Sequence, residues 1–153
     1  MGRIVAQNRK ARHDYSVEDS LEVGIALTGT EIKSVRASNV NLQDAYARID
    51  RGEAWLIGMH IAPWAGGNRN NHEPMRERKL LLHRMQIDQL VGKIKAKGLT
   101  MVPLSMYFND RGKAKIQLGL VRGKKNYDRR RDIAARDARR DLEREVADIQ
   151  RGR

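Results

Sequence analysis

The sequence predicts a β-rich α+β fold: a small closed antiparallel β-barrel with two or three packed helices and a flexible C-terminal tail. Three observations predict it. Apolar and polar residues alternate around two tight turns, two other segments repeat apolar residues at helical spacing, and the composition changes abruptly near residue 121. Several short strands combined with a few helices favour a barrel against which the helices pack.

The clearest strand pair lies in residues 100–121. Apolar residues occupy every second position from Val102 to Phe108 and again from Ala114 to Leu120, and Asn109–Gly112 separates the two runs. A period of two on both sides of an Asn/Asp/Gly turn indicates a hairpin. Pro103 cannot donate to a strand ladder, so we expect it at a strand start or an edge. The alternation predicts that Lys113, Lys115 and Gln117 face away from the core.

A second hairpin is predicted in residues 43–62, where the turn 50–53 separates residues 44–49 from 54–61. Residues 15–27 contain a further strand pair or one long bent strand. Pro63 and the pair Gly66 and Gly67 open a polar loop that extends through His72. We expect this loop to be mobile.

Two helices are predicted by apolar spacing. Residues 30–36 form the first, with Thr30 as its N-cap. In the second, Leu80, Ile87, Val91 and Ile94 recur at helical intervals, and Gly98 is well placed to end it.

The predicted domain covers residues 1–121, and residues 122–153 form a basic tail. The tail carries twelve Arg or Lys and seven Asp or Glu, with Tyr127 as its one aromatic residue. Such a segment buries too little apolar area to offset its ordering entropy alone. Apolar residues from Ala135 to Ile149 nevertheless recur every three or four positions. We expect a tail that is disordered alone and helical against a partner; the alternative is a helix docked permanently on the barrel.

Charge indicates the class of partner. The 153 residues contain 31 Lys and Arg against 19 Asp and Glu, a net charge of +12. This excess favours a polyanion, with nucleic acid first and an acidic membrane surface second; a merely soluble surface is the third interpretation. The chain has no cysteine, which excludes disulfides and thiolate chemistry. No apolar run reaches the roughly 20 residues of a membrane span, and no signal peptide is recognisable, so we expect a cytoplasmic protein.

No catalytic pattern emerges from the sequence. The four histidines show no i, i+4 pair, and residues 119–125 depart from a phosphate-binding loop in glycine spacing and in the final hydroxyl residue. We therefore expect no catalytic residue, metal or cofactor. Two segments, 8–15 and 123–131, instead combine cations, amides and an aromatic ring. Arginine and aromatic faces stack on unpaired bases while lysine contacts phosphate, so these segments favour RNA binding.

Four ordered blocks resemble the SsrA-binding protein family, also called small protein B: residues 8–15, 29–36, 78–83 and 123–130. The resemblance implies an oligonucleotide-binding-like (OB-like) barrel that binds the tRNA-like domain of transfer-messenger RNA. It also implies that the protein stands in for the missing anticodon stem in trans-translation, and that its tail enters the decoding centre and empty mRNA channel of a stalled ribosome. Elongation factor Tu would be an indirect partner, and the protein would act as a monomer.

The family's RNA-contact positions match Glu22, Leu81 and Lys115, with supporting contacts expected from Asn8, Arg9, Arg12, Lys33, Ser34 and Arg36. Glu22 and Leu81 have an alternative structural interpretation, whereas Lys115 should point outward. The tail motif for the decoding centre matches Gly123, Lys124, Lys125, Tyr127, Asp128, Arg129 and Arg130. In this motif Asp-Arg-Arg replaces the commoner Asp-Lys-Arg, which keeps the charge of Arg129 but changes its hydrogen-bonding fork.

Two other functions are compatible with a basic barrel. An RNA-modifying or RNA-hydrolysing enzyme would need an acid–base or metal cluster, which the sequence does not display. A ribosomal protein or general RNA chaperone would share the basic surface, but the four ordered blocks disfavour it.

Overall fold

The computed structural model describes residues 3–67 and 71–123. The chain divides into two units, Met1–Arg122 and Gly123–Arg153. All described residues except Gly123 belong to the first unit. The described helices are α1 (Arg9–Asp14), α2 (Gly29–Arg36) and α3 (Arg84–Lys97). The described strands are β1 (Ile4–Gln7), β2 (Tyr15–Ile25), β3 (Val40–Asn41), β4 (Tyr46–Asp50), β5 (Glu53–Ile57), β6 (His60–Ile61), β7 (Arg78–Leu81), β8 (Thr100–Phe108) and β9 (Ala114–Gly123).

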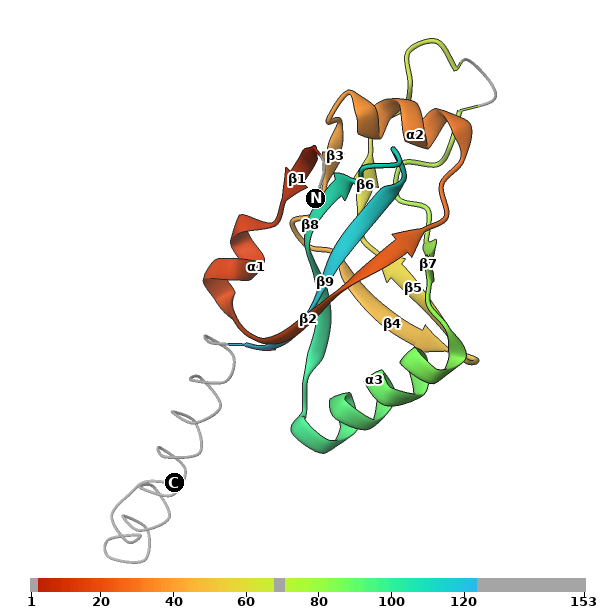
Figure 1. Cartoon of the computed structure of the whole chain (residues 1–153). Coiled ribbons are helices and arrows are strands. Elements are labelled where there is room, and N and C mark those ends of the chain that lie inside the picture. The colour runs from red at the N-terminus through yellow and green to blue at the C-terminus, as the bar shows by residue number, and fades with distance from the viewer. Residues whose placement is uncertain (1–2, 68–70, 124–153) are drawn as a thin grey trace, which may run out of the picture. The chain divides into compact units, whose positions relative to one another are not determined.

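The main sheet closes on itself. Its strand order is β1-β8-β4-β5-β7-β2-β9, and β8 also pairs with β9, so that six strands form a ring with β1 added along β8. In Figure 1, α2 and α3 lie at opposite ends of this strand ring, and α1 lies beside it. The predicted β-rich α+β class is therefore confirmed. The third helix, α1, lies in a segment that was interpreted from the sequence only as an RNA-binding motif.

The β8–β9 hairpin is confirmed, and Ile116, Leu118 and Leu120 of β9 face the main core as predicted, but the first half of β8 faces otherwise. β8 is buried from Met101 to Phe108, and a register shift between Pro103 and Ser105 divides it into two halves. Met101, Met106 and Phe108 join the main core, whereas Val102 and Leu104 pack with Ala11 of α1 in a second cluster. The expectation of a single inward set is wrong, since the bulge rotates the strand and α1 covers its outer face. Pro103 lies at this irregularity, neither at a strand start nor at an edge.

The β4–β5 hairpin is confirmed, with a two-residue turn at Arg51 and Gly52. Both have positive φ, 53° and 77°, as the turns that best fit twisted hairpins require. The expected strand 54–61 is broken at Gly58, whose φ of 82° turns the chain. Beyond that point β6 pairs with β3 in a separate two-stranded sheet.

Two helix boundaries differ from the predicted ones. The cap of α2 is Thr28, not Thr30, because Glu31 at the third helical position completes a reciprocal capping box with Thr28. Leu80 is not helical: it lies in β7, fully buried opposite Ala54 of β5. The helix begins only after His83 and ends at Gly98 as predicted.

Candidate RNA-binding interface

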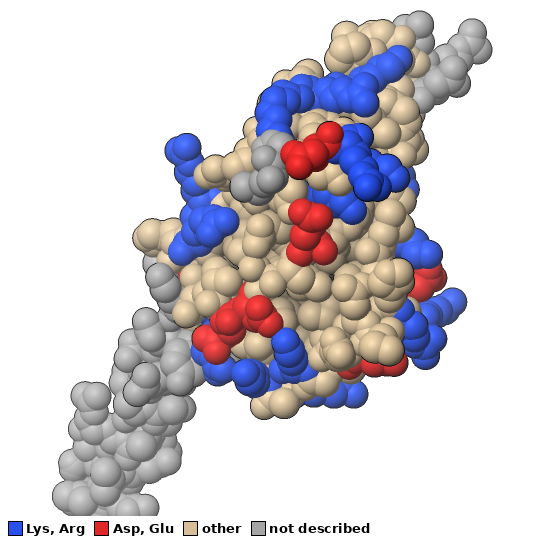
Figure 2. Space-filling view, in the orientation of Figure 1, with Lys and Arg blue, Asp and Glu red and all other residues tan. Residues whose placement is uncertain are grey.

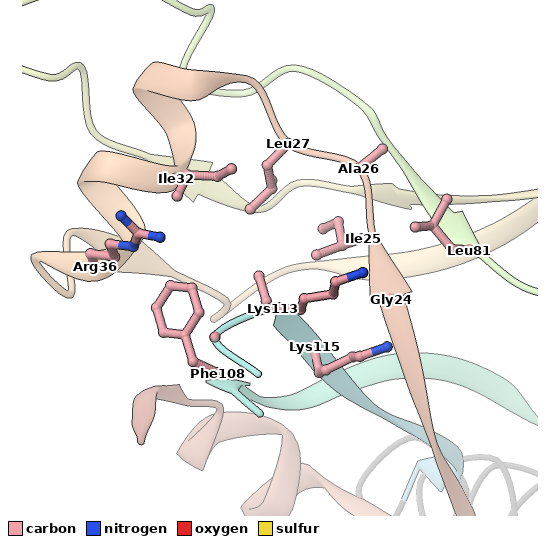
Figure 3. Close-up of a pocket in the computed structure, with 12 residues that line it drawn as sticks. Gly24, Ile25, Ala26, Leu27, Ile32, Arg36, Leu81, Phe108, Lys113 and Lys115 are labelled. Carbon is pink, nitrogen blue, oxygen red and sulfur yellow. The ribbon is translucent and has the colours of Figure 1, made fainter. Parts of the chain in front are cut away.

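A groove of about 370 Å³ opens at the end of the strand ring that carries α2. Figure 3 shows α2 on one side of it and the β8–β9 hairpin on the other. Its lining residues are Gly24, Ile25, Ala26, Leu27, Ile32, Arg36, Leu81, Phe108, Gly112, Lys113, Ala114 and Lys115.

This groove combines an apolar floor with a cationic rim. Ile25, Leu27 and Ile32 project toward the same space in Figure 3, whereas the side chains of Lys113 and Lys115 lie on the opposite side of it from Arg36. No described residue that lines the groove is acidic. In Figure 2, acidic side chains form small separate groups and basic side chains extend over the margins of the view. An apolar floor bordered by unopposed cations fits a ligand that is both planar and anionic, as nucleotides are.

The turn between β8 and β9 fixes one part of this rim. The Asn109 side-chain oxygen accepts from the backbone N–H groups of Arg111 (3.0 Å) and Lys113 (2.9 Å), and the backbone N–H of Asn109 donates to Lys113. Gly112, whose φ is 74°, donates to the Asn109 carbonyl. Lys113 is therefore held at the mouth of the groove by a closed turn.

Glu22 and Lys115 lie on the same outer region of the strand ring. Lys115 faces Tyr107 in the β8–β9 register, and the Tyr107 hydroxyl donates a hydrogen bond to Glu22. Burial of Tyr107 and this bond to a carboxylate raise the pKa of Tyr107 to about 12. The hydroxyl consequently stays protonated at neutral pH and fixes the Glu22 carboxylate, which the sequence alone did not indicate.

Leu81 is an exposed apolar side chain, not a core residue. It is 53% exposed on β7, and it faces Gly24 of β2 in the strand register. A side chain at position 24 would meet Leu81 at 3.2 Å, so the glycine leaves room for Leu81 at the groove edge. An exposed leucine beside cations suits contact with a base or ribose.

The three predicted α2 residues separate into two groups. Lys33 and Arg36 are exposed, and the Arg36 guanidinium lies 5.9 Å from the centre of the Phe108 ring. Ser34 is fully buried, and its hydroxyl donates to the Ala62 carbonyl at 2.7 Å. Ser34 therefore cannot contact RNA in this structure and instead attaches α2 to the segment after β6.

A buried ion cluster fixes α2 against β7. Glu31 and Arg78 are both fully buried, and the Arg78 Nε donates to Glu31 at 2.7 Å. Arg76 donates to the other carboxylate oxygen at 2.7 Å, as does the Thr28 backbone N–H at 2.9 Å. Burial alone would raise the pKa of Glu31, but the hydrogen bonds from Arg76, Thr28 and Arg78 outweigh it and lower the pKa to about 2. The cluster holds together two walls of the groove, since Arg36 and Leu81 extend from the same two elements.

The cations of α1 lie away from the groove. Arg9 and Arg12 are exposed on α1, which precedes the first residue of β2, whereas Gly24 of the groove is near its last. Nine residues of extended strand correspond to roughly 30 Å. The structure therefore brings together Arg36, Leu81 and Lys115 but leaves Arg9 and Arg12 at a distance from them.

Asn8 is buried and structural. It is 1% exposed, its side-chain nitrogen donates to the carbonyls of Leu42 (3.0 Å) and Pro103 (2.9 Å), and its oxygen accepts from the Ala11 N–H as the α1 cap. The expected RNA contact is thus replaced by positioning of α1. The amide nitrogen and the oxygen of Asn8 are both used in these hydrogen bonds, as expected for a buried helix cap.

Most of the predicted tail motif lies outside the described residues: Lys124, Lys125, Tyr127, Asp128, Arg129 and Arg130. Gly123 is described and forms the last residue of β9. Residues 68–70 of the predicted polar loop also lie outside the description. Beside them, Asn71 makes two hydrogen bonds to the Trp64 backbone, at 2.9 and 2.6 Å. His72 bridges the Thr30 hydroxyl and the Ile61 carbonyl, with both distances 2.9 Å.

The described residues contain no group of three or more His, Asp or Glu side chains arranged to hold a metal ion. Among the same residues, no helix is long and apolar enough to cross a membrane. Sequence reasoning did not single out Phe108 and Lys113, which line the groove, or Tyr107, which donates to Glu22. Lys113 was predicted to point outward, but only the closed ring shows that it shares a groove with Arg36.

Comparison with known proteins supplies the family. The model described as SmpB protein matches residues 5–148. The SsrA-binding protein of Desulfitobacterium hafniense is 57% identical over 150 residues, covering 98% of this chain and 96% of that one. The SsrA-binding protein of Moorella thermoacetica is 54% identical over 154 residues, covering 99% of both chains.

A solved structure described as "tmRNA-SmpB: a journey to the center of the bacterial ribosome" is also similar. It is 51% identical, with a TM-score of 0.65, and the match covers 78% of this chain and 83% of that one. The family-model match and the identity to full-length relatives agree over nearly the whole sequence. This chain belongs to the SmpB family of SsrA-binding proteins.

Proposed function

We propose that this protein binds transfer-messenger RNA and delivers it to stalled ribosomes for trans-translation. The observation that carries the proposal is a groove lined by three cations and by no described acidic residue. The chain is also 51% identical to the protein in a solved structure whose description names tmRNA-SmpB and the bacterial ribosome. The role is one of binding, in which the protein replaces the missing anticodon stem and performs no bond chemistry.

The proposed division of labour follows the sequence. Residues 1–121 act as an RNA-gripping body, and residues 122–153 act as a basic tail that is disordered alone and folds as a helix in the empty mRNA channel. We further propose that the strand ring is a closed, OB-like barrel. The return of the strand order from β9 to β8 supports closure, and the scarcity of apolar residues after Val121 supports a tail that needs a partner to fold.

Within the body, RNA contacts are assigned to exposed side chains and to the half-buried Lys115. Glu22, Lys33, Arg36, Leu81 and Lys115 serve the groove region, and Arg9 and Arg12 serve a separate surface on α1. Asn8 and Ser34 act indirectly, because their side chains are buried and hydrogen-bonded to the backbone. The decoding-centre contacts are assigned to Gly123, Lys124, Lys125, Tyr127, Asp128, Arg129 and Arg130.

The remaining elements of the proposal concern the cellular setting. The protein acts in the cytoplasm as a monomer, with the ribosome as its second partner and elongation factor Tu as an indirect one through the shared RNA. The SmpB family and the ribosomal setting named for the similar structure support the ribosome as a partner.

The test is the RNA that copurifies with the full-length protein from its bacterial host. We expect one dominant species with a tRNA-like end, and we expect the purified protein to restore peptide tagging on stalled ribosomes in a reconstituted translation reaction. A broad mixture of RNAs with no tagging activity would instead support a general RNA chaperone.

A further inference from the structure

The two arginines beside Phe108 are an unusual feature of the groove. The Arg3 guanidinium lies 5.6 Å from the centre of the Phe108 ring, and that of Arg36 lies 5.9 Å from the same centre. Within residues 3–67 and 71–123, neither arginine takes part in an ion pair with Asp or Glu. Two like charges at one ring repel each other, so an anion bound beside both would relieve that repulsion.

Hydrogen bonds to the backbone hold Arg3 in place, and the Arg36 side chain lies against the Phe108 ring. The Phe108 N–H donates to the Arg3 carbonyl at 2.9 Å, which fixes Arg3 beside the end of β8. One Arg3 guanidinium nitrogen donates to the Arg36 carbonyl at 2.8 Å, at the C-terminus of α2. A guanidinium has five N–H donors, so this bond leaves others available to a ligand. The Arg3 guanidinium is therefore preorganised, which lowers the entropic cost of binding a ligand there.

The position of this pair relative to the groove indicates the ligand. Phe108 and Arg36 lie at one side of the apolar floor in Figure 3, and Lys113 and Lys115 lie at the other. An occupant must therefore offer an apolar planar group to Leu27 and Ile32 and anionic groups on both sides. A nucleotide in an unpaired loop has this chemistry, with a base between two backbone phosphates.

We propose that the groove holds one unstacked nucleotide of the bound RNA, with its base on the apolar floor. Arg3 and Arg36 bind the phosphate on one side of that nucleotide, and Lys113 and Lys115 bind the phosphate on the other. This inference rests on the proposed RNA-binding function and adds Arg3, Lys113 and a base-binding floor to it.

The test measures the affinity of the full-length protein for the tRNA-like half of transfer-messenger RNA at several salt concentrations. The double variant of Arg3→Gln with Arg36→Gln should reduce the magnitude of the slope of log affinity against log salt by about 0.7–0.9, the effect of losing one phosphate contact, and each single variant should reduce it by a part of that. Arg84→Gln is the matched control, because Arg84 is an exposed arginine of α3, at the opposite end of the strand ring. It should leave the slope unchanged.

A second variant tests the base-binding floor separately. Leu27→Phe places a ring where the base would lie and removes no charge. It should weaken binding about tenfold without changing the salt slope, and chemical probing of the RNA should show one loop base, protected by the wild-type protein, becoming reactive. Circular dichroism and thermal unfolding identify any variant that misfolds; Ile32→Phe then replaces Leu27→Phe as the filling substitution, since Ile32 also projects into the groove.

The outcomes separate the two levels of inference. If the wild-type protein does not bind the RNA, the proposed function fails and this inference fails with it. If the wild-type protein binds but Arg3→Gln and Arg36→Gln behave like Arg84→Gln, the phosphate site is refuted while the function stands. If the floor variant binds like wild type and no base is protected, the base does not enter the groove.

Discussion

Helix α2 has two arginines near each of its ends, and the two pairs differ in whether an acidic side chain binds them. At its N-terminal end, Arg76 and Arg78 bind the buried Glu31. At its C-terminal end, Arg3 and Arg36 are exposed beside Phe108, with no acidic partner among the described residues. The charges of the first pair are balanced within the protein by Glu31, whereas the second pair remains available to a ligand. Net charge cannot separate these roles, because it counts both pairs equally.

The largest expected effect comes from removing the carboxylate that pairs with Arg76 and Arg78. Glu31→Gln leaves Arg78 buried without a counter-charge, and breaking a buried pair in this way costs about 3–5 kcal/mol. Urea unfolding measures the loss. Glu53→Gln is the matched control: it breaks the ion pair with Lys79, whose two side chains are each nearly half exposed, so it should cost less than about 1 kcal/mol. Equal costs for the two variants would contradict the distinction between them.

Acid provides a second way to break the same cluster. The folded-state pKa of Glu31 is about 2, below the 4.5 of an unperturbed glutamate. A depressed pKa means that the unfolded state binds the proton first, so the stabilisation is complete above pH 4.5 and is lost as the pH falls toward 2. The contribution is about 3 kcal/mol by this linkage. Unfolding free energies of wild type and Glu31→Gln should therefore converge between pH 4.5 and 2; a constant gap would show that Glu31 does not titrate there.

The α1 surface offers a smaller structural effect. Asn8→Ala removes the helix cap and leaves the carbonyls of Leu42 and Pro103 without their donor, which should cost about 2 kcal/mol. Because Asn8 acts by positioning, the salt dependence of RNA affinity should not change. Arg12→Gln is the comparison, since it should leave stability unchanged and reduce the salt slope of any RNA contact made by α1.

These contrasts also explain how far the sequence could be interpreted. Strict alternation predicted the β8–β9 hairpin, and the spacing of Ile87, Val91 and Ile94 predicted α3. The alternation could not predict which face of β8 is covered, since Val102 and Leu104 are buried by α1, far away in the sequence. Likewise, local patterns identified Arg36 as a cation but not its neighbour Arg3. The partners of a charge are set by tertiary contacts, and these do not appear in local sequence.

Resemblance to a family predicted more of the site than the local patterns did. It did not distinguish residues that could contact RNA from buried residues that hold those residues in position. Arg36, Leu81 and Lys115 do line one groove. Asn8 and Ser34, expected among the same contacts, are buried and bonded to backbone carbonyls. Both roles constrain a residue equally, so a matching motif cannot show whether a side chain contacts RNA or holds the residue that does.

The next prediction concerns a single cation of the available group. Lys115→Ala should weaken binding of the tRNA-like RNA by roughly five- to tenfold and reduce the magnitude of the salt slope by up to about 0.7–0.9, the full change for one phosphate contact, of which Lys113 retains a part. The unfolding free energy should stay within about 0.5 kcal/mol of wild type, as is usual for surface substitutions. Unchanged affinity at both low and physiological salt would exclude a phosphate contact at this position.

The smallest expected effect tests whether Glu22 contacts the RNA through its own carboxylate. Tyr107→Phe removes only the hydroxyl that donates to Glu22, so Glu22 keeps its charge but loses its fixed orientation. If Glu22 accepts a hydrogen bond from a base or a 2′-hydroxyl, affinity should fall about threefold, and Glu22→Gln should fall further because the amide accepts more weakly. The double variant should then match Glu22→Gln alone, since Tyr107 acts through Glu22. Because the pKa of Tyr107 is about 12, its hydroxyl remains a donor at neutral pH, and the wild-type advantage over Tyr107→Phe should be constant from pH 6 to 9. Additive losses in the double variant would instead show that the two residues contribute to binding independently.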